Sequence, residues 1–140
     1  MNFSQSWLFP ALLCVAAWGV SRLFPKLATN HIDPKSALTF EVIGEVLVVI
    51  FILGSAGFGK LMFDLKGTSY AVLAGLFGGA GVYWYLVAAD RGNVSQLVGV
   101  TALYPVITVI LGVLVLNEPL TAKQIIGVGL AVVAVYLVSS

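Results

Sequence analysis

Two glutamates inside a long apolar segment are the residues of this sequence best suited to chemistry. Glu41 and Glu45 lie four residues apart and therefore share one face of a helix. If that helix begins near Pro34, they lie about 10 Å and about 16 Å along it, at about 1.5 Å per residue. A charged acid near the bilayer centre costs about 2.5–3.5 kcal/mol, so it needs a cavity, a partner or a proton.

Two hypotheses follow for this pair of acids. In the first, the carboxylates bind a cation or a proton inside the membrane, which is the usual role of an intramembrane acid. In the second, the helix begins deeper in the chain, so that Glu41 lies among the lipid headgroups while Glu45 snorkels to water or pairs with a base. The sequence leaves both hypotheses open.

A second group of polar side chains lies on one helical stripe closer to the C-terminus. Thr101, Tyr104 and Thr108 stand at positions i, i+3 and i+7, next to Pro105. The proline lacks an N–H and predicts a kink that frees the carbonyl near Thr101. The stripe suits a wet path through a helix bundle, although threonine also forms hydrogen bonds between membrane helices. The amphipathic ring of Tyr104 favours the path.

Aromatic residues mark two further positions. Trp18 lies late in the first apolar segment, and Tyr83-Trp84-Tyr85 lies in the third. Such side chains can anchor a helix at the membrane interface. They can also form the wall of a cavity for an organic substrate, where a ring face holds a cation. Both interpretations stay open for both positions.

Small residues predict where helices pack closely. Gly75 and Gly79 form a GxxxG pair, which allows two helix backbones to approach each other. Gly127, Ala131 and Ala134 form a small-residue stripe in the last apolar segment. We predict that both stripes are packing faces, toward another helix or another protomer.

The composition places all these residues in a membrane protein. Of 140 residues, 60% are hydrophobic and 9% are charged, against roughly 45–50% and roughly 25% in soluble domains. The net charge of +1, without a basic cluster, argues against a nucleic-acid partner. The single cysteine excludes an internal disulfide. We also expect no metal site, no cofactor and no enzyme activity, because no catalytic cluster is present.

Five apolar segments are long enough to cross a bilayer as helices, which takes about 20 residues each. Helices are required because lipid offers the backbone no hydrogen-bond partners. Asp33-Pro34 predicts the start of the second helix, and Thr121 to Gln124 predict a capping box before the fifth. We see no internal repeat, so residues 1–140 are predicted to form a single all-α membrane domain. Its helices are predicted over about 7–24, 34–54, 70–89, 95–116 and 122–138.

The basic residues are nearly balanced across the predicted membrane. A positive-inside bias normally fixes the orientation of such a protein, but the two sides here differ by one charge. Either one residue or the order of insertion decides the orientation, or copies insert both ways and pair as an antiparallel dimer. The two sets are Lys60, Lys66 and Lys123 on the N-terminal side, and Arg22, Lys26, Lys35 and Arg91 on the other.

Residues 89–138 carry the pattern of a known family. Leu103-Tyr104-Pro105, then NEPLT at residues 117–121, then Ile126-Gly127 follow the order of a fourth helix, a turn and a fifth helix. In this order they resemble an EamA-type unit of the drug/metabolite transporter superfamily, and Trp18-Gly19 is similar to its first helix. The resemblance covers essentially the whole chain. The second helix differs, since Phe40-Glu41-Val42 stands where the family often has an arginine.

The resemblance implies a secondary transporter, often an exporter of small metabolites, amino acids or drugs. Most members resemble two fused units, ten helices in an inverted repeat with the site near the midplane. A single unit therefore implies an antiparallel homodimer, or a pair with a subunit of opposite topology, in the inner membrane of a prokaryote. Transport is possible with or without coupling to protons. In that setting the expected path residues are Trp18, Glu41, Glu45, Tyr83, Thr101 and Tyr104.

Two other functions compete with transport. A small dual-topology channel would show flux too fast for a conformational cycle. A non-transporting membrane subunit would purify with a partner and show no flux alone. The two acids and the polar stripe favour transport, because a purely structural bundle has no need of them.

Overall fold

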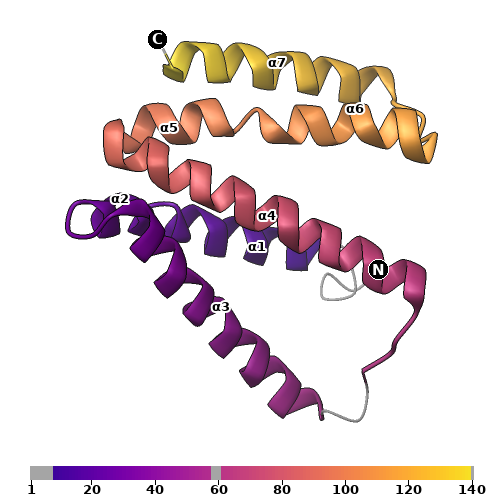
Figure 1. The fold of residues 1–140 in the computed structure, drawn as a ribbon. Coiled ribbons are helices and arrows are strands. Elements are labelled where there is room, and N and C mark those ends of the chain that lie inside the picture. The colour runs from indigo at the N-terminus through magenta and orange to yellow at the C-terminus, as the bar shows by residue number, and fades with distance from the viewer. Residues whose placement is uncertain (1–7, 58–60, 140) are drawn as a thin grey trace. The chain divides into compact units, whose positions relative to one another are not determined.

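The computed structural model describes residues 8–57 and 61–139. All regular structure within these residues is α-helical, which confirms the predicted all-α class (Figure 1). The helices are α1 (Leu8–Ser21), α2 (Phe24–Thr29), α3 (Pro34–Ala56), α4 (Leu65–Arg91), α5 (Val94–Thr101), α6 (Tyr104–Leu116) and α7 (Ala122–Ser139).

Four helical stretches are long and apolar enough to cross a membrane. The first joins α1 with α2, and the fourth joins α5 with α6. Large apolar side chains on these stretches are widely exposed, which is stable only where lipid or another apolar surface covers them. The chain is therefore a multi-pass integral membrane protein. The stretches are Leu8–Thr29, Pro34–Ser55, Leu65–Arg91 and Val94–Leu116, and a shorter apolar helix covers Ala122–Val138.

The first span differs from its predicted bounds. The sequence predicts an end near Phe24, whereas the helix resumes after a break at Arg22 and Leu23 and runs to Thr29. Pro25 lies in the first turn of α2, where its missing N–H is unneeded, so the proline interrupts the span without ending it.

The third span begins earlier than the sequence predicts. α4 starts at Leu65 rather than near Tyr70. The carboxylate of Asp64 accepts a hydrogen bond from the Gly67 N–H at 2.7 Å, so Asp64 caps the helix from a position that we took for a connecting segment. Lys60, one of the basic residues in the charge balance, lies outside the described residues.

The caps predicted for α3 and α7 are both confirmed. Asp33 accepts hydrogen bonds from the N–H groups of Lys35 at 2.9 Å and Ser36 at 3.2 Å. The hydroxyl of Ser36 also donates to Asp33, and this bond is the main cause that lowers the pKa of the carboxyl. Before α7, Gln124 Oε1 accepts from the Thr121 N–H at 2.8 Å, and Thr121 Oγ1 accepts from the Gln124 N–H at 3.4 Å.

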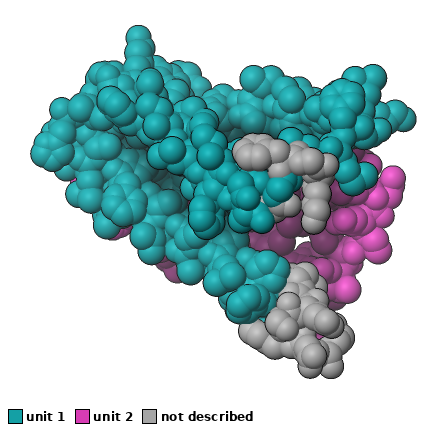
Figure 2. Space-filling view, turned by 90° about the horizontal axis from the view of Figure 1, so that it is seen from below, with its two compact units in different colours: residues 1–91 teal, residues 92–140 magenta. Residues whose placement is uncertain are grey.

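The chain divides into two compact units, residues 1–91 and residues 92–140 (teal and magenta in Figure 2). In unit 1, α2 packs against both α3 and α4, with Pro25, Ala37 and Leu86 buried. In unit 2, α5 packs against α7 (Figure 1). Gly99 permits that contact, because a Cβ at this position would lie 2.8 Å from Val138 Cγ1.

Both broken spans break within similar short sequences, an imperfect repeat that shares its glycine, valine, leucine and proline. Residues 19–25 are GVSRLFP and residues 99–105 are GVTALYP. The N–H groups of Arg22 and Ala102 bond to the carbonyl four residues back, at 3.1 and 3.0 Å. Those of Leu23 and Leu103 reach only three residues back, at 3.3 and 3.2 Å. The helix tightens and ends there because the proline two residues later has no N–H.

Candidate functional site

A cavity of about 270 Å³ lies beside the break between α1 and α2. All four helices of unit 1 and the loop before α3 contribute to its wall, and most of the side chains are apolar. Glu41 is the one charged residue among the described residues that line it. The lining consists of Ser21, Phe24, Pro25, Ala28, Ile32, Ala37, Phe40, Glu41 and Leu86.

The sequence places Glu41 at this cavity through the start of α3. The Asp33 cap and Pro34 fix the first turn of the helix, so Glu41 lies two turns further on. Ala37, one turn before it, is only 4% exposed because α3 packs there against its neighbours. Glu41 itself is half-buried. The helix thus begins at Pro34 and not deeper in the chain, so Glu41 lies two turns inside it, as the hypothesis of a cation or proton site requires.

Arg22 lies at the break and interacts electrostatically with Glu41. Its guanidinium carbon lies over the ring of Tyr85, 5.1 Å from the centroid, a cation–π contact. Its carbonyl oxygen accepts a hydrogen bond from the Tyr85 hydroxyl at 3.1 Å. Tyr85 is only 6% exposed, so the buried ring holds both ends of Arg22 against α4.

Lys26 of α2 forms a hydrogen bond with the end of α4, close to the same break. Its Nζ donates to the carbonyl of Ala89 at 2.8 Å. Ala89 is among the last residues of α4, where carbonyls lack partners in the helix and where a cation is favoured by the helix dipole. Sequence reasoning missed Arg22 and Lys26 as parts of the site, and in the aromatic run it expected Tyr83 rather than Tyr85 on the path. The signal was the spacing of Arg22 and Lys26, which puts two cations on one helix face.

The other expected path residues of unit 1 are not among the residues that line the cavity. Trp18 is 53% exposed, and its carbonyl accepts a hydrogen bond from the Ser21 hydroxyl at 2.9 Å. Glu45 lies one turn beyond Glu41 and is exposed. Tyr83 is half-buried and packs edge-to-face on Trp84, with ring centroids 5.4 Å apart. The structure thus brings Glu41 alone of these four to the cavity.

The polar stripe of unit 2 extends across the break between α5 and α6. The Thr101 hydroxyl donates to the Leu97 carbonyl at 2.8 Å, and the Thr108 hydroxyl donates to the Tyr104 carbonyl at 3.2 Å. Both hydroxyl protons are thus used within the helix, which leaves oxygen lone pairs for other groups. The Tyr104 side chain is 54% exposed. The helix is interrupted next to Pro105, where the sequence predicts a kink, since α5 ends at Thr101 and α6 begins at Tyr104.

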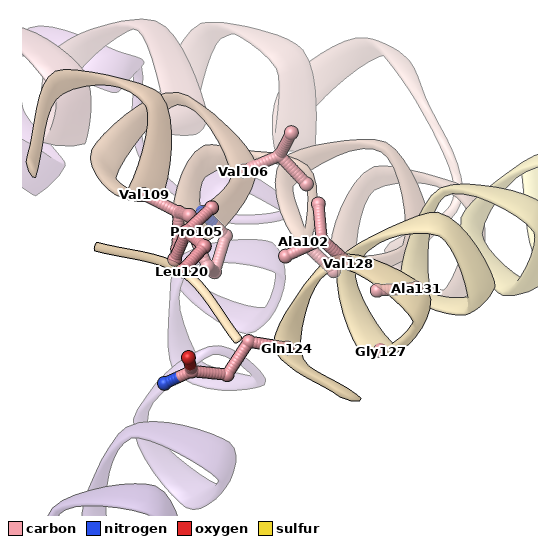
Figure 3. Close-up of a pocket in the computed structure, with 9 residues that line it drawn as sticks. All are labelled: Ala102, Pro105, Val106, Val109, Leu120, Gln124, Gly127, Val128 and Ala131. Carbon is pink, nitrogen blue, oxygen red and sulfur yellow. The ribbon is translucent and has the colours of Figure 1, made fainter. Parts of the chain in front are cut away.

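A second cavity, of about 320 Å³, lies between α6 and α7 (Figure 3). Two members of the predicted small-residue stripe, Gly127 and Ala131, line it opposite Pro105, Val106 and Val109. This part of the stripe therefore faces open space within unit 2. The remaining lining residues are Ala102, Leu120, Gln124 and Val128.

The remaining small residues also face outward. A Cβ built on Gly75 or Gly79 would meet no atom within 4 Å, so the GxxxG face of α4 has no close neighbour among the described residues. Ala134 of α7 is exposed as well. Packing between protomers at these positions stays a prediction.

A comparison with family models decides what kind of protein carries these cavities. Residues 5–140 match the model of the EamA-like transporter family. The chain belongs to this family. The resemblance seen in the sequence is thereby confirmed, and the EamA chain is a membrane transporter of the drug/metabolite type.

Curated relatives fall into two length classes. "Uncharacterized protein MJ1333.1" of Methanocaldococcus jannaschii is 27% identical over 128 residues, 91% of the EamA chain and 92% of its own length. "Uncharacterized transporter in cobO 3'region" of Sinorhizobium sp is 29% identical over 127 residues, 89% of the EamA chain and 90% of its own. "WAT1-related protein At3g02690, chloroplastic" of Arabidopsis thaliana is 28% identical over 136 residues, but the EamA chain spans only 32% of it. No solved structure matches the chain significantly.

Proposed function

We propose that this EamA protein is a secondary transporter that exports a small organic molecule by alternating access, as a dimer of two oppositely oriented copies. The cavity beside Glu41 carries the proposal. A small-molecule site is typically an apolar pocket with a few placed polar groups. A carboxylate within a membrane-spanning helix also points to a substrate or an ion. The inner membrane of a prokaryote is the proposed location.

Two observations support a dimer. The chain spans about 90% of two relatives, one of them named a transporter, but a third of the Arabidopsis one, so units of this size occur both singly and within longer chains. The open GxxxG face at Gly75 and Gly79 is also suited to close helix packing. Because the unit has an odd number of predicted crossings, two oppositely inserted copies would reproduce an inverted repeat.

In this proposal the two polar regions form parts of one path. Glu41 binds the substrate or a coupling proton, with Trp18, Glu45 and Tyr83 nearer the mouth. Thr101 and Tyr104 supply hydroxyl oxygens along α5 and α6. The break between α5 and α6 supplies the bend about which helices rock between the two faces of the membrane, whereas the break between α1 and α2 stays fixed beside the Glu41 cavity.

Flux into reconstituted vesicles tests transport. The probes are a radiolabelled primary amine, an amino acid, a carboxylate and a nucleoside, each tested for counterflow with and without a proton gradient. We expect counterflow of at least one probe, at least tenfold lower in Glu41→Gln and in Tyr104→Ala. Glu118→Gln, the same amide change in the turn after α6, is the matched control. Wild-type flux without saturation or counterflow would identify a channel instead.

Cysteine cross-linking tests the antiparallel dimer in a Cys14→Ser background. In an antiparallel pair related by a twofold axis through the middle of α7, Ala131→Cys lies near its own copy and cross-links. Leu137→Cys then lies roughly 18 Å from its own copy, at about 1.5 Å per residue, and does not cross-link. Cross-linking at Leu137→Cys, or reporter signals from only one side of the membrane, would contradict the dimer.

A further inference from the structure

The polar groups on the wall of the Glu41 cavity are all hydrogen-bond acceptors. In its ionised form the carboxylate of Glu41 can accept hydrogen bonds but cannot donate one. Ser21 lines the cavity, and its hydroxyl already donates its proton to the Trp18 carbonyl at 2.9 Å, so the hydroxyl can offer a ligand only its oxygen lone pairs. The carbonyl of Ser21 has lost its helical donor, because the residue four positions on is Pro25. No side chain that lines the cavity in the described part of the chain offers a free donor.

The nearby cations are held outside this wall. Neither Arg22 nor Lys26 is among the described residues that line the cavity. The Arg22 guanidinium lies over the Tyr85 ring, and Lys26 donates to the Ala89 carbonyl. A bound donor therefore meets Glu41 without a basic side chain between them. The charge of Arg22 still acts on Glu41, which weakens the attraction for a second cation and allows its release.

The rest of the wall limits the size and the body of the ligand. Phe24, Phe40, Ile32 and Leu86 make it apolar, and two of these are aromatic rings that can attract a cation. At about 270 Å³ the cavity is slightly smaller than the range of roughly 300–1,000 Å³ that is typical of drug-sized ligands. The ligand must therefore be small and apolar apart from its donor.

From these features we infer that the cavity binds a small organic cation, a protonated amine on an apolar body, with Glu41 as its counter-ion. This inference rests on the proposed transport function and names the substrate class. The ammonium group donates to Glu41 and to the Ser21 oxygens, and the apolar body lies against Phe24 and Phe40. A carboxylate ligand would be repelled by Glu41, and a neutral alcohol would lack the ionic attraction.

Binding of three probes of similar shape tests the inference. The protein in lipid nanodiscs is titrated calorimetrically with benzylamine, benzyl alcohol and benzoate, with empty nanodiscs as the control for partition into lipid. We expect saturable binding of benzylamine, at least tenfold weaker binding of benzyl alcohol, and no binding of benzoate. Equal affinity for the amine and the alcohol would overturn the inference.

Variants then locate the site. Glu41→Gln is expected to weaken benzylamine binding at least tenfold, and Ala28→Leu is expected to weaken it by filling the cavity without touching Glu41. Glu118→Gln should bind as the wild type does. Unchanged thermal unfolding separates these effects from misfolding, and wild-type affinity in folded Glu41→Gln would reject the site.

The flux assay separates failure of this inference from failure of the proposed function. If a carboxylate or a nucleoside shows counterflow but benzylamine does not bind, the transport function is supported and the inference of an organic-cation site is rejected. A second outcome is that the wild type does not bind benzylamine and that proton coupling disappears in Glu41→Gln. The carboxylate would then bind only the proton, and the inference of an organic-cation site would again be rejected. Counterflow of benzylamine that Glu41→Gln abolishes supports both.

Discussion

The two broken spans have similar sequences and the same hydrogen-bond pattern at the break but differ in what holds the break. Between α1 and α2, the Tyr85 hydroxyl bonds to the Arg22 carbonyl, and the Arg22 guanidinium lies over the Tyr85 ring. Four residues on, Lys26 reaches the end of α4. At the matching positions of unit 2 stand Ala102 and Val106. Their side chains can make neither the cation–π contact of Arg22 nor the hydrogen bond of Lys26. Two similar heptapeptides thus differ in their contacts, since that of unit 1 is anchored to α4 and that of unit 2 lacks these anchors.

This difference shows that the position of a helix break and the strength with which it is held have separate causes. The local sequence decides where the helix breaks, because Pro25 and Pro105 remove the same N–H from the same pattern. Neighbouring helices decide how firmly the break is held. In unit 2, α5 packs on α7 through Gly99, whereas α6 faces a cavity of about 320 Å³. We therefore expect the break in unit 2 to be the more mobile one, and the break in unit 1 to be a fixed wall of the Glu41 cavity.

Removing the Tyr85 ring should have the largest effect on this contrast. Tyr85→Ala deletes a buried aromatic side chain, and we expect it to lower the free energy of unfolding by about 3–5 kcal/mol. Tyr85→Phe removes only the hydroxyl and should lower it by about 0.5–1.5 kcal/mol. Tyr104→Ala, a ring that is 54% exposed in unit 2, should change it by less than about 1 kcal/mol. Denaturant unfolding in micelles measures all three, and equal losses at Tyr85 and Tyr104 would contradict unequal anchoring.

Removing the Lys26 ammonium should have the next largest effect. Lys26→Met keeps most of the apolar stem but leaves the Ala89 carbonyl without its donor, and we expect a loss of about 1 kcal/mol in the free energy of unfolding. Lys35→Met, in the exposed first turn of α3, is the matched control and should be near neutral. Faster amide exchange at the end of α4 in Lys26→Met alone would support the anchor, and identical exchange in both variants would remove it.

Replacing the proline at each break by alanine restores an N–H, and the resulting gains in stability should differ between the two breaks by a smaller amount than the losses above. In Pro105→Ala the new N–H can bond to the Thr101 carbonyl, because Ala102 and Val106 cannot make the side-chain contacts that Arg22 and Lys26 make at the first break. The gain is about 0.5–1.5 kcal/mol, seen as slower hydrogen exchange near Thr101. In Pro25→Ala the contacts of Arg22 and Lys26 with α4 resist straightening, so the gain should be smaller. A larger slowing in Pro25→Ala would reverse the assignment of the mobile break.

The smallest expected effect is a pH response of the two helix caps. Hydrogen bonds from Ser36 lower the pKa of Asp33 in the folded chain, so its cap stabilises α3 fully above the unfolded pKa. That stability is lost as the pH falls through the lower, folded pKa. The cap of α7 uses Thr121 and Gln124, which do not titrate in this range. Acidification should therefore speed amide exchange at the start of α3 and leave the start of α7 unchanged.

The sequence was sufficient for features that depend on local chemistry. Continuous apolar runs predicted the all-α membrane class, and Asp33 and Thr121 predicted two caps that the structure confirms. Pro105 predicted a disturbance of the fourth predicted helix, which is interrupted there. Asp64 was missed because the apolar run that defined the third helix begins after it. The repeat was missed because it covers seven residues, too few to show against the similar composition of all the helices.

The candidate site was only partly predictable because it depends on long-range contacts. The depth of Glu41 along its helix indicated an intramembrane acid, but no local pattern shows that Tyr85 and Lys26 meet the first span across sixty-three residues of sequence. The charge balance treated Arg22 and Lys26 as loop cations. In the structure both belong to the helical span, where the side chain of one lies over a ring and that of the other meets a helix end.

The bond between Lys26 and Ala89 also has a consequence for biosynthesis. Its two residues are 63 positions apart, and at about 5–20 residues per second the ribosome completes the second roughly 3–13 s after the first. During that interval Arg22 and Lys26 have no partner on α4, and two uncompensated cations oppose complete insertion of the first span. We therefore expect this span to reach its final position in the membrane only after α4 has been synthesised.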